Sequence, residues 1–262
     1  MHLLFFTHLG SDFVKIPLRS HIPISYRLWA GRFSWLYILL ALPELAIRAL
    51  DQPTVLHYLA KPLPMLALIA CYAWQRRPQR SDTLLGLGLI CSLAGDVLLM
   101  FEGYFLGGLV AFLLAHLAYI GAFATEVPTT RLRSVLLRKP WLSLPAVGYA
   151  WMLLSLLYPT LITELVWPVT IYSMVLLAMV LAALHRWRRM PDPSFAGVFG
   201  GALLFLLSDS LLAVDRFAQS VLPIPLAGVW IMLTYYAAQY FITLGMLLHG
   251  QMRQQEPHTL RP

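Results

Sequence analysis

Runs of about twenty apolar residues recur along the whole chain, separated by short segments that contain charged residues or proline. A run of this length can cross the hydrocarbon core of a bilayer as an α-helix. The pattern predicts eight such helices, over residues 34–50, 54–74, 83–101, 104–125, 140–158, 165–184, 196–215 and 226–248. It therefore indicates an all-α, polytopic membrane protein with eight transmembrane helices.

Composition supports a membrane protein with a single domain. Hydrophobic residues make up 59% of the chain and charged residues only 12%, whereas soluble domains carry about 25% charged residues. No long polar segment is left over for a separate soluble domain. We expect residues 1–33 to form a basic cytoplasmic or interfacial arm, residues 34–249 the transmembrane domain, and residues 250–262 a disordered cytoplasmic tail.

Most of the positive charge lies before the first predicted helix, in alternate connections between the helices and after the last one. Because cytoplasmic loops are rich in Lys and Arg, this distribution places both termini in the cytoplasm. The net charge of +7 thus reports membrane topology and does not indicate a nucleic-acid partner. Sixteen of the 19 cations lie on the predicted cytoplasmic side: Lys15, Arg19, Arg27, Arg32, Arg76, Arg77, Arg80, Arg131, Arg133, Arg138, Lys139, Arg186, Arg188, Arg189, Arg253 and Arg261.

Two stretches with a carboxylate inside an apolar run align with each other. "SLAGDVLLMF" contains Asp96 and "LFLLSDSLLAVDRF" contains Asp209, and an offset of 113 positions pairs these residues. The same offset pairs Glu102 with Asp215. Since the two stretches lie on the third and seventh predicted helices, which cross in the same direction, the pattern predicts a parallel 4+4 internal repeat about an axis along the membrane normal.

Polar side chains on several predicted helices fall at one depth. Asp96 and Asp209 each lie about 20 Å from the cytoplasmic end of their helix, and Lys61 falls nearly at their level. Charged groups that face lipid are costly, so we expect this layer to face the interior of the bundle in the outer half of the membrane. Asp96 and Asp209 are the candidate catalytic residues, and the candidate substrate-binding residues are Lys61, His116, Tyr119, Tyr172, Tyr235, Tyr236 and Gln239.

Each of these residues also has a structural interpretation. An intramembrane Asp can be a neutral, hydrogen-bonded link between helices, and a buried His can simply be packed. Lys61 can be the counter-ion of a carboxylate or a ligand for a phosphate group. Tyrosine is frequent near membrane interfaces in any case.

The motifs that the sequence lacks narrow the chemistry. It contains no HExxH motif for a metal, no GxSxG nucleophile elbow and no Walker loop. Two carboxylates, a Lys and a His remain, and these groups suit acid–base catalysis. We therefore expect no metal and no organic cofactor.

Several motifs together resemble the YhhN-like lysoplasmalogenase family. They are "KPLPM", "SLAGDVLLMF", "GGLVAFLLAHLAYI", "GALLFLLSDSLLAVDRF" and "YYAAQYFITLG", and the resemblance extends over roughly residues 35–248. It implies an eight-helix membrane hydrolase that cleaves the vinyl-ether bond of lysoplasmalogens, a class of lysophospholipid. The products would be a fatty aldehyde and glycerophosphoethanolamine or glycerophosphocholine. Asp96 and Asp209 match the catalytic carboxylates of the family.

The chemistry of vinyl ethers agrees with this expectation. They resist base and hydrolyse when an acid protonates the β-carbon, which leaves an oxocarbenium ion that a second carboxylate can stabilise, as in glycoside hydrolysis. We expect the protein to work among membrane lipids in a bacterial inner membrane, with the active site towards the outer half of the bilayer. Two alternatives remain: a proton-coupled transporter, or a lipid-binding membrane protein without turnover that uses the same Asp and Lys layer.

Overall fold

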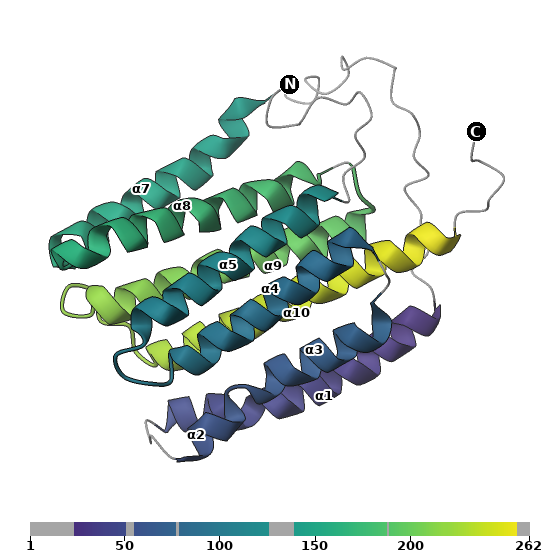
Figure 1. Ribbon diagram of the computed structural model, residues 1–262, viewed down its shortest axis with the longest axis horizontal. Coiled ribbons are helices and arrows are strands. Elements are labelled where there is room, and N and C mark those ends of the chain that lie inside the picture. Colours follow the sequence, from purple (N-terminus) through teal and green to yellow (C-terminus); the bar gives the residue numbers. More distant parts are fainter. Residues whose placement is uncertain (1–23, 51–54, 77–78, 126–138, 188, 256–262) are drawn as a thin grey trace, which may run out of the picture.

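The structure is a computed structural model that describes residues 24–50, 55–76, 79–125, 139–187 and 189–255. Every regular element in these ranges is helical, and together they form an elongated bundle (Figure 1). The elements are α1 (Ile24–Ala49), α2 (Val55–Ala60), α3 (Leu63–Gln75), α4 (Arg80–Leu98), α5 (Phe105–Thr125), η1 (Pro140–Ser143), α7 (Leu144–Leu157), η2 (Tyr158–Thr160), α8 (Thr163–His185), α9 (Asp192–Phe217) and α10 (Ala227–Gln255).

These elements provide eight helical segments that are long and apolar enough to cross a membrane, as the sequence predicts. Helices α2 and α3 together form the second crossing, and η1, α7 and η2 together form the fifth. The all-α membrane fold is therefore confirmed. The internal repeat and the cytoplasmic placement of the termini stay predictions.

The two terminal helices are longer than predicted. Helix α1 begins at Ile24, ten residues before the predicted start, so residues 24–33 of the predicted arm are helical. Aromatic packing accounts for this start, because the ring of Phe33 stacks on Trp29 at 5.9 Å and on Tyr240 of α10 at 6.5 Å. At the other end α10 continues to Gln255, past the predicted start of the tail. Residues 1–23 and 256–262 lie outside the described residues.

The second crossing is interrupted at Lys61 and Pro62, between α2 and α3. Pro62 and Pro64 have no backbone N–H, and each also disfavours the helical conformation in the residue before it. The interruption leaves backbone carbonyls without a helical donor. One of them, the Lys61 carbonyl, accepts a hydrogen bond of 2.8 Å from the hydroxyl of Tyr236 on α10.

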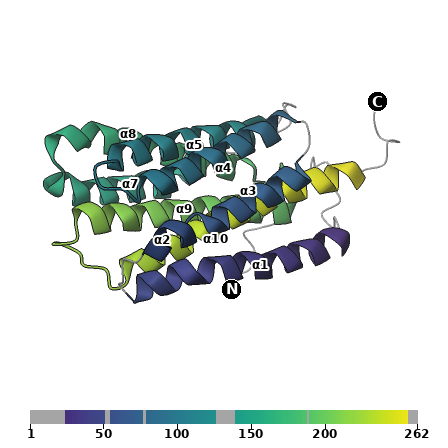
Figure 2. The same ribbon diagram turned by 60° about the horizontal axis from the view of Figure 1, so that its bottom comes forward.

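Helix α10 lies at the centre of the bundle, between α1 and α9, whereas α7 lies at the periphery (Figures 1 and 2). Close approach of backbones explains the central packing. A Cβ atom on Gly201 of α9 would lie 2.8 Å from the carbonyl oxygen of Ala238 of α10. Helices α4 and α5 form a second close pair, because a Cβ atom on Gly88 would overlap the ring of Tyr119. Small residues at such contacts are typical of helix packing in membranes.

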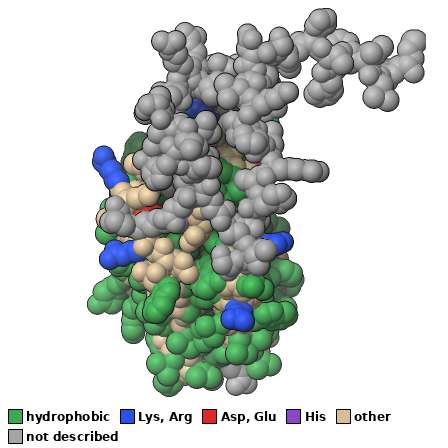
Figure 3. Space-filling view, turned by 90° about the vertical axis from the view of Figure 1, so that its right-hand side faces the viewer, with side chains coloured by type: hydrophobic (Ala, Val, Ile, Leu, Met, Phe, Trp, Pro, Cys, Tyr) green, Lys and Arg blue, Asp and Glu red, His purple; other side chains and the backbone are tan. Residues whose placement is uncertain are grey.

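The two ends of the bundle differ in charge. One end is formed by the first turns of α1, α4 and α9 and the last turns of α3, α5, α8 and α10; we call it the basic end. Figure 3 views it directly and shows Lys and Arg side chains around its margin above apolar flanks. The candidate site lies nearer the opposite end.

Candidate active site

Asp96 and Asp209 lie at similar heights in the bundle. Asp96 is 16 residues after the first residue of α4, and Asp209 is 17 residues after the first residue of α9. At 1.5 Å per residue both lie about 25 Å from the basic end. Helix α4 ends two residues after Asp96, whereas α9 continues for eight residues beyond Asp209. Only Asp209 therefore has two further helical turns between itself and the opposite end.

Asp96 is buried beside polar groups from α10 and from the turn between α2 and α3. The hydroxyl of Tyr235 on α10 donates a hydrogen bond of 2.6 Å to its Oδ2 atom. Nζ of Lys61, in the turn between α2 and α3, lies 3.2 Å from its backbone carbonyl oxygen. The hydroxyl of Tyr236, also on α10, donates a hydrogen bond to the carbonyl of Lys61. We call Asp96, Lys61, Tyr235 and Tyr236 the Asp96 cluster; its polar groups join α4 to α10 and to the broken second crossing.

Within this cluster Lys61 caps the last turn of α4. The final four carbonyl groups of a helix have no helical donor, and a cation is favourable beside them. In α4, backbone N–H groups of the following residues satisfy the carbonyls of Gly95, Val97 and Leu98. The remaining carbonyl, of Asp96, is bound by the ammonium group of Lys61. Lys61 lies at the level of the carboxylates, as predicted, and its ammonium group binds a backbone carbonyl there.

Asp209 has a different set of partners. The hydroxyl of Tyr172 on α8 donates a hydrogen bond of 2.5 Å to its Oδ2 atom. Nε2 of His116 on α5 lies 3.7 Å from the same oxygen, too far for a hydrogen bond. The His116 ring is fully buried, and neither of its nitrogen atoms has a hydrogen-bond partner. We call Asp209, Tyr172 and His116 the Asp209 cluster.

A narrow apolar pocket lies beside the Asp209 cluster and is partly open to the outside. Asp209 is the one carboxylate in its wall and Tyr172 the one tyrosine. The rest of the wall consists almost entirely of hydrophobic side chains. The pocket therefore suits an apolar chain whose reactive bond lies beside Asp209. Its lining residues are Leu99, Phe105, Leu109, Phe112, Leu153, Val169, Tyr172, Ser173, Leu176, Asp209, Ser210, Leu212, Ala213 and Phe217.

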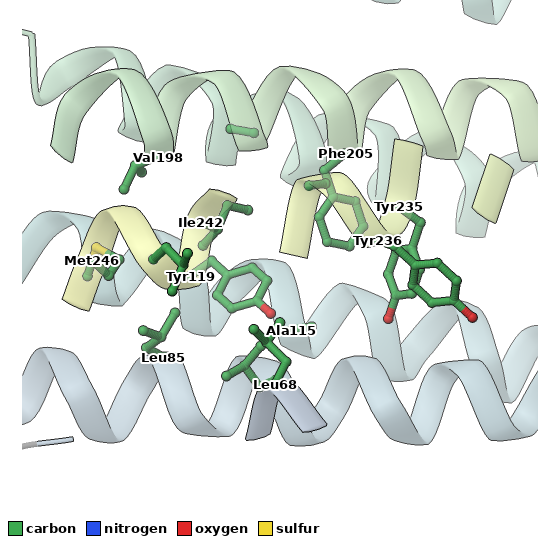
Figure 4. Packing of buried hydrophobic residues seen from close by; sticks show 14 of the residues in the cluster. Leu68, Leu85, Ala115, Tyr119, Val198, Phe205, Tyr235, Tyr236, Ile242 and Met246 are labelled. Atoms are coloured by element: carbon green, nitrogen blue, oxygen red, sulfur yellow. The ribbon is translucent and has the colours of Figure 1, made fainter. Parts of the chain in front are cut away.

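Aromatic rings stand between the two clusters. The Phe205 ring lies 4.7 Å from that of His116 and 5.6 Å from that of Tyr235, centroid to centroid. Phe112 packs edge-on against both Phe205 and Tyr235, and Figure 4 shows Phe205 close to Tyr235 in the core. The sequence predicts one chamber for all the polar groups. The structure instead divides them into two adjoining clusters, of which only the Asp209 cluster contributes to the pocket wall.

Tyr119 and Gln239 form a separate contact nearer the basic end. The hydroxyl of Tyr119 donates a hydrogen bond of 2.6 Å to Oε1 of Gln239, and both side chains are fully buried. His116 and Tyr119 lie three residues apart on one face of α5, as predicted, but they reach different partners. Neither Tyr119 nor Gln239 lies in the pocket wall. No contact with the pocket supports the prediction that these two residues bind substrate.

Sequence reasoning missed a charged network on α1 and α2. The fully buried carboxylate of Glu44 binds Nε of Arg48 at 2.9 Å and Nδ1 of His57 at 2.8 Å. Nη2 of Arg48 lies 3.3 Å from Nε2 of His57 and closes the network. The signal was present in the sequence: Glu44 stands inside a predicted span and Arg48 follows four residues later, on the same helix face.

The part of the chain that the structure describes contains no group of three or more His, Cys, Asp or Glu side chains that could hold a metal ion. The site instead offers a carboxyl group, a phenol and an imidazole next to an apolar pocket. Such groups can transfer protons to and from a molecule bound in the pocket.

Comparison with known proteins identifies the family. The model of the YhhN family matches residues 56–246, from α2 to α10. The chain belongs to the YhhN family. This YhhN protein is 39% identical over 214 residues to human "Lysoplasmalogenase TMEM86B", a match that covers 80% of this chain and 81% of the human protein.

Relatives of this YhhN protein in other organisms carry the same name. The mouse "Lysoplasmalogenase TMEM86B" is 36% identical over 239 residues, covering 88% of this chain and 93% of the mouse protein. A "Lysoplasmalogenase" of Mycobacterium tuberculosis (strain CDC 1551 / Oshkosh) is 34% identical over 232 residues, covering 83% of this chain and 80% of that protein. No solved structure matches the chain. The family match contains both clusters but not Glu44 and Arg48, which precede it.

Proposed function

We propose that this protein is a lysoplasmalogenase, which hydrolyses the vinyl-ether bond of lysoplasmalogens to a fatty aldehyde and glycerophosphoethanolamine or glycerophosphocholine. The observation that carries the proposal is the position of Asp209. Its carboxyl group stands in the wall of an apolar pocket and is held there by Tyr172. The names of the relatives agree with this substrate class.

The substrate would place its vinyl-ether carbons against Asp209. The alkenyl chain is apolar, and the wall formed by Leu109, Phe112, Val169 and Leu176 would remove its first carbons from water. Burial around the reacting bond would also exclude bulk water from the oxocarbenium intermediate until one water molecule is positioned to attack.

Asp209 would act first as the acid. Its Oδ2 atom accepts the hydrogen bond of Tyr172, so the proton would be carried on Oδ1. That proton would pass to the β-carbon of the vinyl ether, where the electron pair of the double bond forms the new C–H bond. The carbon attached to the ether oxygen becomes an oxocarbenium ion, and Asp209 becomes a carboxylate next to it.

Asp209 would then act as the base. Water adds to the oxocarbenium carbon and gives one proton to the Asp209 carboxylate, which restores the acid. In the resulting hemiacetal, the hydroxyl proton moves to the glycerol oxygen and the bond between carbon and that oxygen breaks. His116 lies 3.7 Å from Asp209, and its nitrogen atoms are available to receive and return protons during these steps.

Asp96 would supply the fixed negative charge. It is separated from the pocket by aromatic rings, so its effect on the oxocarbenium ion would be electrostatic, through a medium of low dielectric constant. The ammonium group of Lys61 lies on the backbone carbonyl of Asp96, and the hydroxyl of Tyr235 donates a hydrogen bond to the Asp96 carboxyl group. Two carboxyl groups in different surroundings would thus take two roles, as in glycoside hydrolases.

The site would face the outer half of a bacterial inner membrane. The positive-inside rule puts the basic end in the cytoplasm, and Asp209 lies about 25 Å from that end. The transporter alternative has less support, because the only interrupted crossing among the described residues is the second one. Its counterpart in the predicted repeat, α8, runs without a break past Pro168.

Product analysis with the purified protein tests the proposal. The protein in detergent micelles is incubated with 1-alkenyl lysophosphatidylethanolamine in D₂O, and the aldehyde is trapped at once by borohydride reduction. Protonation of the β-carbon predicts one deuterium at C2 of the resulting fatty alcohol, in an amount equal to the glycerophosphoethanolamine formed. Absence of aldehyde, or release of a fatty product without deuterium at C2, would refute the proposed reaction.

A further inference from the structure

The rim of the pocket farthest from the basic end carries a positive charge. Phe105, the first residue of α5, and Phe217, the last residue of α9, meet edge-to-face at 5.5 Å, and both belong to the pocket wall. The guanidinium carbon of Arg216 lies 5.4 Å from the centre of the Phe105 ring. We call Phe105, Arg216 and Phe217 the mouth of the pocket. The Arg216 side chain is exposed there.

Arg216 and Asp209 lie on one face of α9. They are seven residues apart, and seven residues make almost two full turns of an α-helix. Their side chains therefore point in nearly the same direction, with a rise of about 10 Å between them. Ala213, which lies between them on this face, also lines the pocket. A molecule that occupies the pocket and extends past Phe105 would come within reach of both residues.

Cations at this end of the bundle are few. Of the 19 Lys and Arg residues, only Arg48, Lys61 and Arg216 lie on the predicted outer side. Arg48 binds Glu44, and Lys61 binds the carbonyl of Asp96. Arg216 has no ion pair with any described residue. It is the cation of the three that stands over an aromatic ring of the pocket wall.

We infer that Arg216 binds the phosphate group of the lysophospholipid whose vinyl-ether bond meets Asp209. This inference rests on the proposed function. Seven covalent bonds separate the phosphorus atom from the β-carbon of the vinyl ether, a reach of about 8 Å in an extended chain. This reach matches the rise from Arg216 to Asp209. A guanidinium group can bind two phosphate oxygens at once, and Arg216, which lies over the Phe105 ring, has no carboxylate partner among the described residues that would compete for its N–H groups.

The assignment explains how one site can select both ends of its substrate. When the phosphate is bound at the mouth, the length of the glycerol linker sets how deep the vinyl ether lies in the pocket. The bond to be cleaved then lies at the level of Asp209. The same contact distinguishes a lysophospholipid from neutral glycerol ethers, which have no phosphate. Arg216 is thus a substrate-binding residue that sets the position of the bond to be cleaved, and Lys61 is not needed for that task.

Binding of uncleavable ether lipids tests this inference without relying on turnover. The dissociation constants of 1-O-alkyl lysophosphatidylethanolamine and of 1-O-alkylglycerol are measured by tryptophan fluorescence with the purified full-length protein in micelles. Wild-type protein should bind the phosphate-bearing lipid at least about tenfold more tightly, the usual effect of a charge-assisted hydrogen bond. Arg216→Gln should lose most of this preference and bind the neutral lipid as the wild type does, and Arg216→Lys should keep part of it.

Arg80→Gln is the matched control, because it makes the same substitution at an exposed Arg of the basic end. It should keep the full preference for phosphate. The inference is overturned if Arg216→Gln keeps the preference, or if it weakens binding of both lipids equally, as a purely structural residue or a general membrane anchor would. Failure of the proposed function would look different: the phosphate preference would persist and depend on Arg216, but no aldehyde would be released from the vinyl-ether lipid.

Discussion

The hydroxyl group of Tyr172 donates a hydrogen bond of 2.5 Å to Oδ2 of Asp209, and both side chains lie in the pocket wall. The bond occupies one carboxyl oxygen and leaves the other for the substrate. It also fixes the rotation of the carboxyl group, because Tyr172 is itself held edge-on against the His116 ring at 5.3 Å. In the proposed mechanism, the geometry of proton transfer would therefore depend on Tyr172, which does not itself exchange a proton with the substrate.

Tyr172→Phe should lower kcat by about tenfold and change KM little. The variant keeps the ring but removes the hydroxyl that orients Asp209, and a hydrogen bond to a carboxyl group contributes about 1.5–3 kcal/mol. Steady-state aldehyde release gives both constants. Tyr158→Phe, which removes a hydroxyl bonded to Thr170 outside the pocket wall, is the control and should keep wild-type kcat. An unchanged kcat in Tyr172→Phe would show that Asp209 needs no such orientation.

Asp96→Asn and Asp209→Asn should each reduce turnover by a factor of at least about 10², the usual effect of removing a general acid or base. Both variants keep the size of the side chain, so they should still insert and purify as the wild type does. The control is Glu102→Gln, which alters an exposed carboxylate at the same end of the bundle. Full turnover in either Asn variant would make that Asp a structural link between helices and would contradict its catalytic role.

Lys61→Met should lower stability more than it alters substrate affinity. The ammonium group satisfies the Asp96 carbonyl at the end of α4, and its loss should cost about 1.5–3 kcal/mol of unfolding free energy. Urea or thermal unfolding in micelles measures this change, with exposed Lys139→Met as the matched control. Lys61 lines no part of the pocket, so KM should stay within about threefold of wild type, a binding difference below 1 kcal/mol. A tenfold rise in KM at unchanged stability would instead make Lys61 a phosphate ligand.

Glu44→Ala should destabilise the bundle by about 2 kcal/mol or more, because it leaves the side chains of Arg48 and His57 without their shared anion. The midpoint of thermal unfolding should fall accordingly. Glu102→Ala, at an exposed position, should change it little. Equal midpoints for the two variants would mean that the network contributes nothing measurable to the fold.

Reporter fusions should place Glu102 and Glu164 outside the cell and Arg133 inside it. The expectation follows from the segregation of sixteen cations to one side. Alkaline phosphatase fusions, active only outside the cytoplasm, and green fluorescent protein fusions, fluorescent only inside it, give opposite signals at each position. Phosphatase activity after Arg133 would reverse the orientation and would put the pocket in the inner half of the membrane.

Periodicity and length predicted the number of helices and the height of the polar residues, because both depend only on the rise per residue and the thickness of a bilayer. The start of α1 was missed, since Arg27 and Arg32 made its first turns look interfacial. Which polar groups meet could not be deduced, because that depends on how helices pack. Asp96 takes its tyrosine from the eighth crossing and Asp209 from the sixth, a pairing that the predicted repeat does not reproduce.

The buried position of Lys61 also concerns the fate of the product. Fatty aldehydes form Schiff bases with lysine amines, so an enzyme that releases them is exposed to modification by its own product. The chain has three lysines; of the two that the structure describes, Lys61 lies inside the bundle and Lys139 is exposed. The amine of Lys61 binds the Asp96 carbonyl, the residue as a whole is 5% exposed, and the pocket wall contains no lysine. An aldehyde formed at Asp209 would therefore meet no primary amine among the residues that line the pocket.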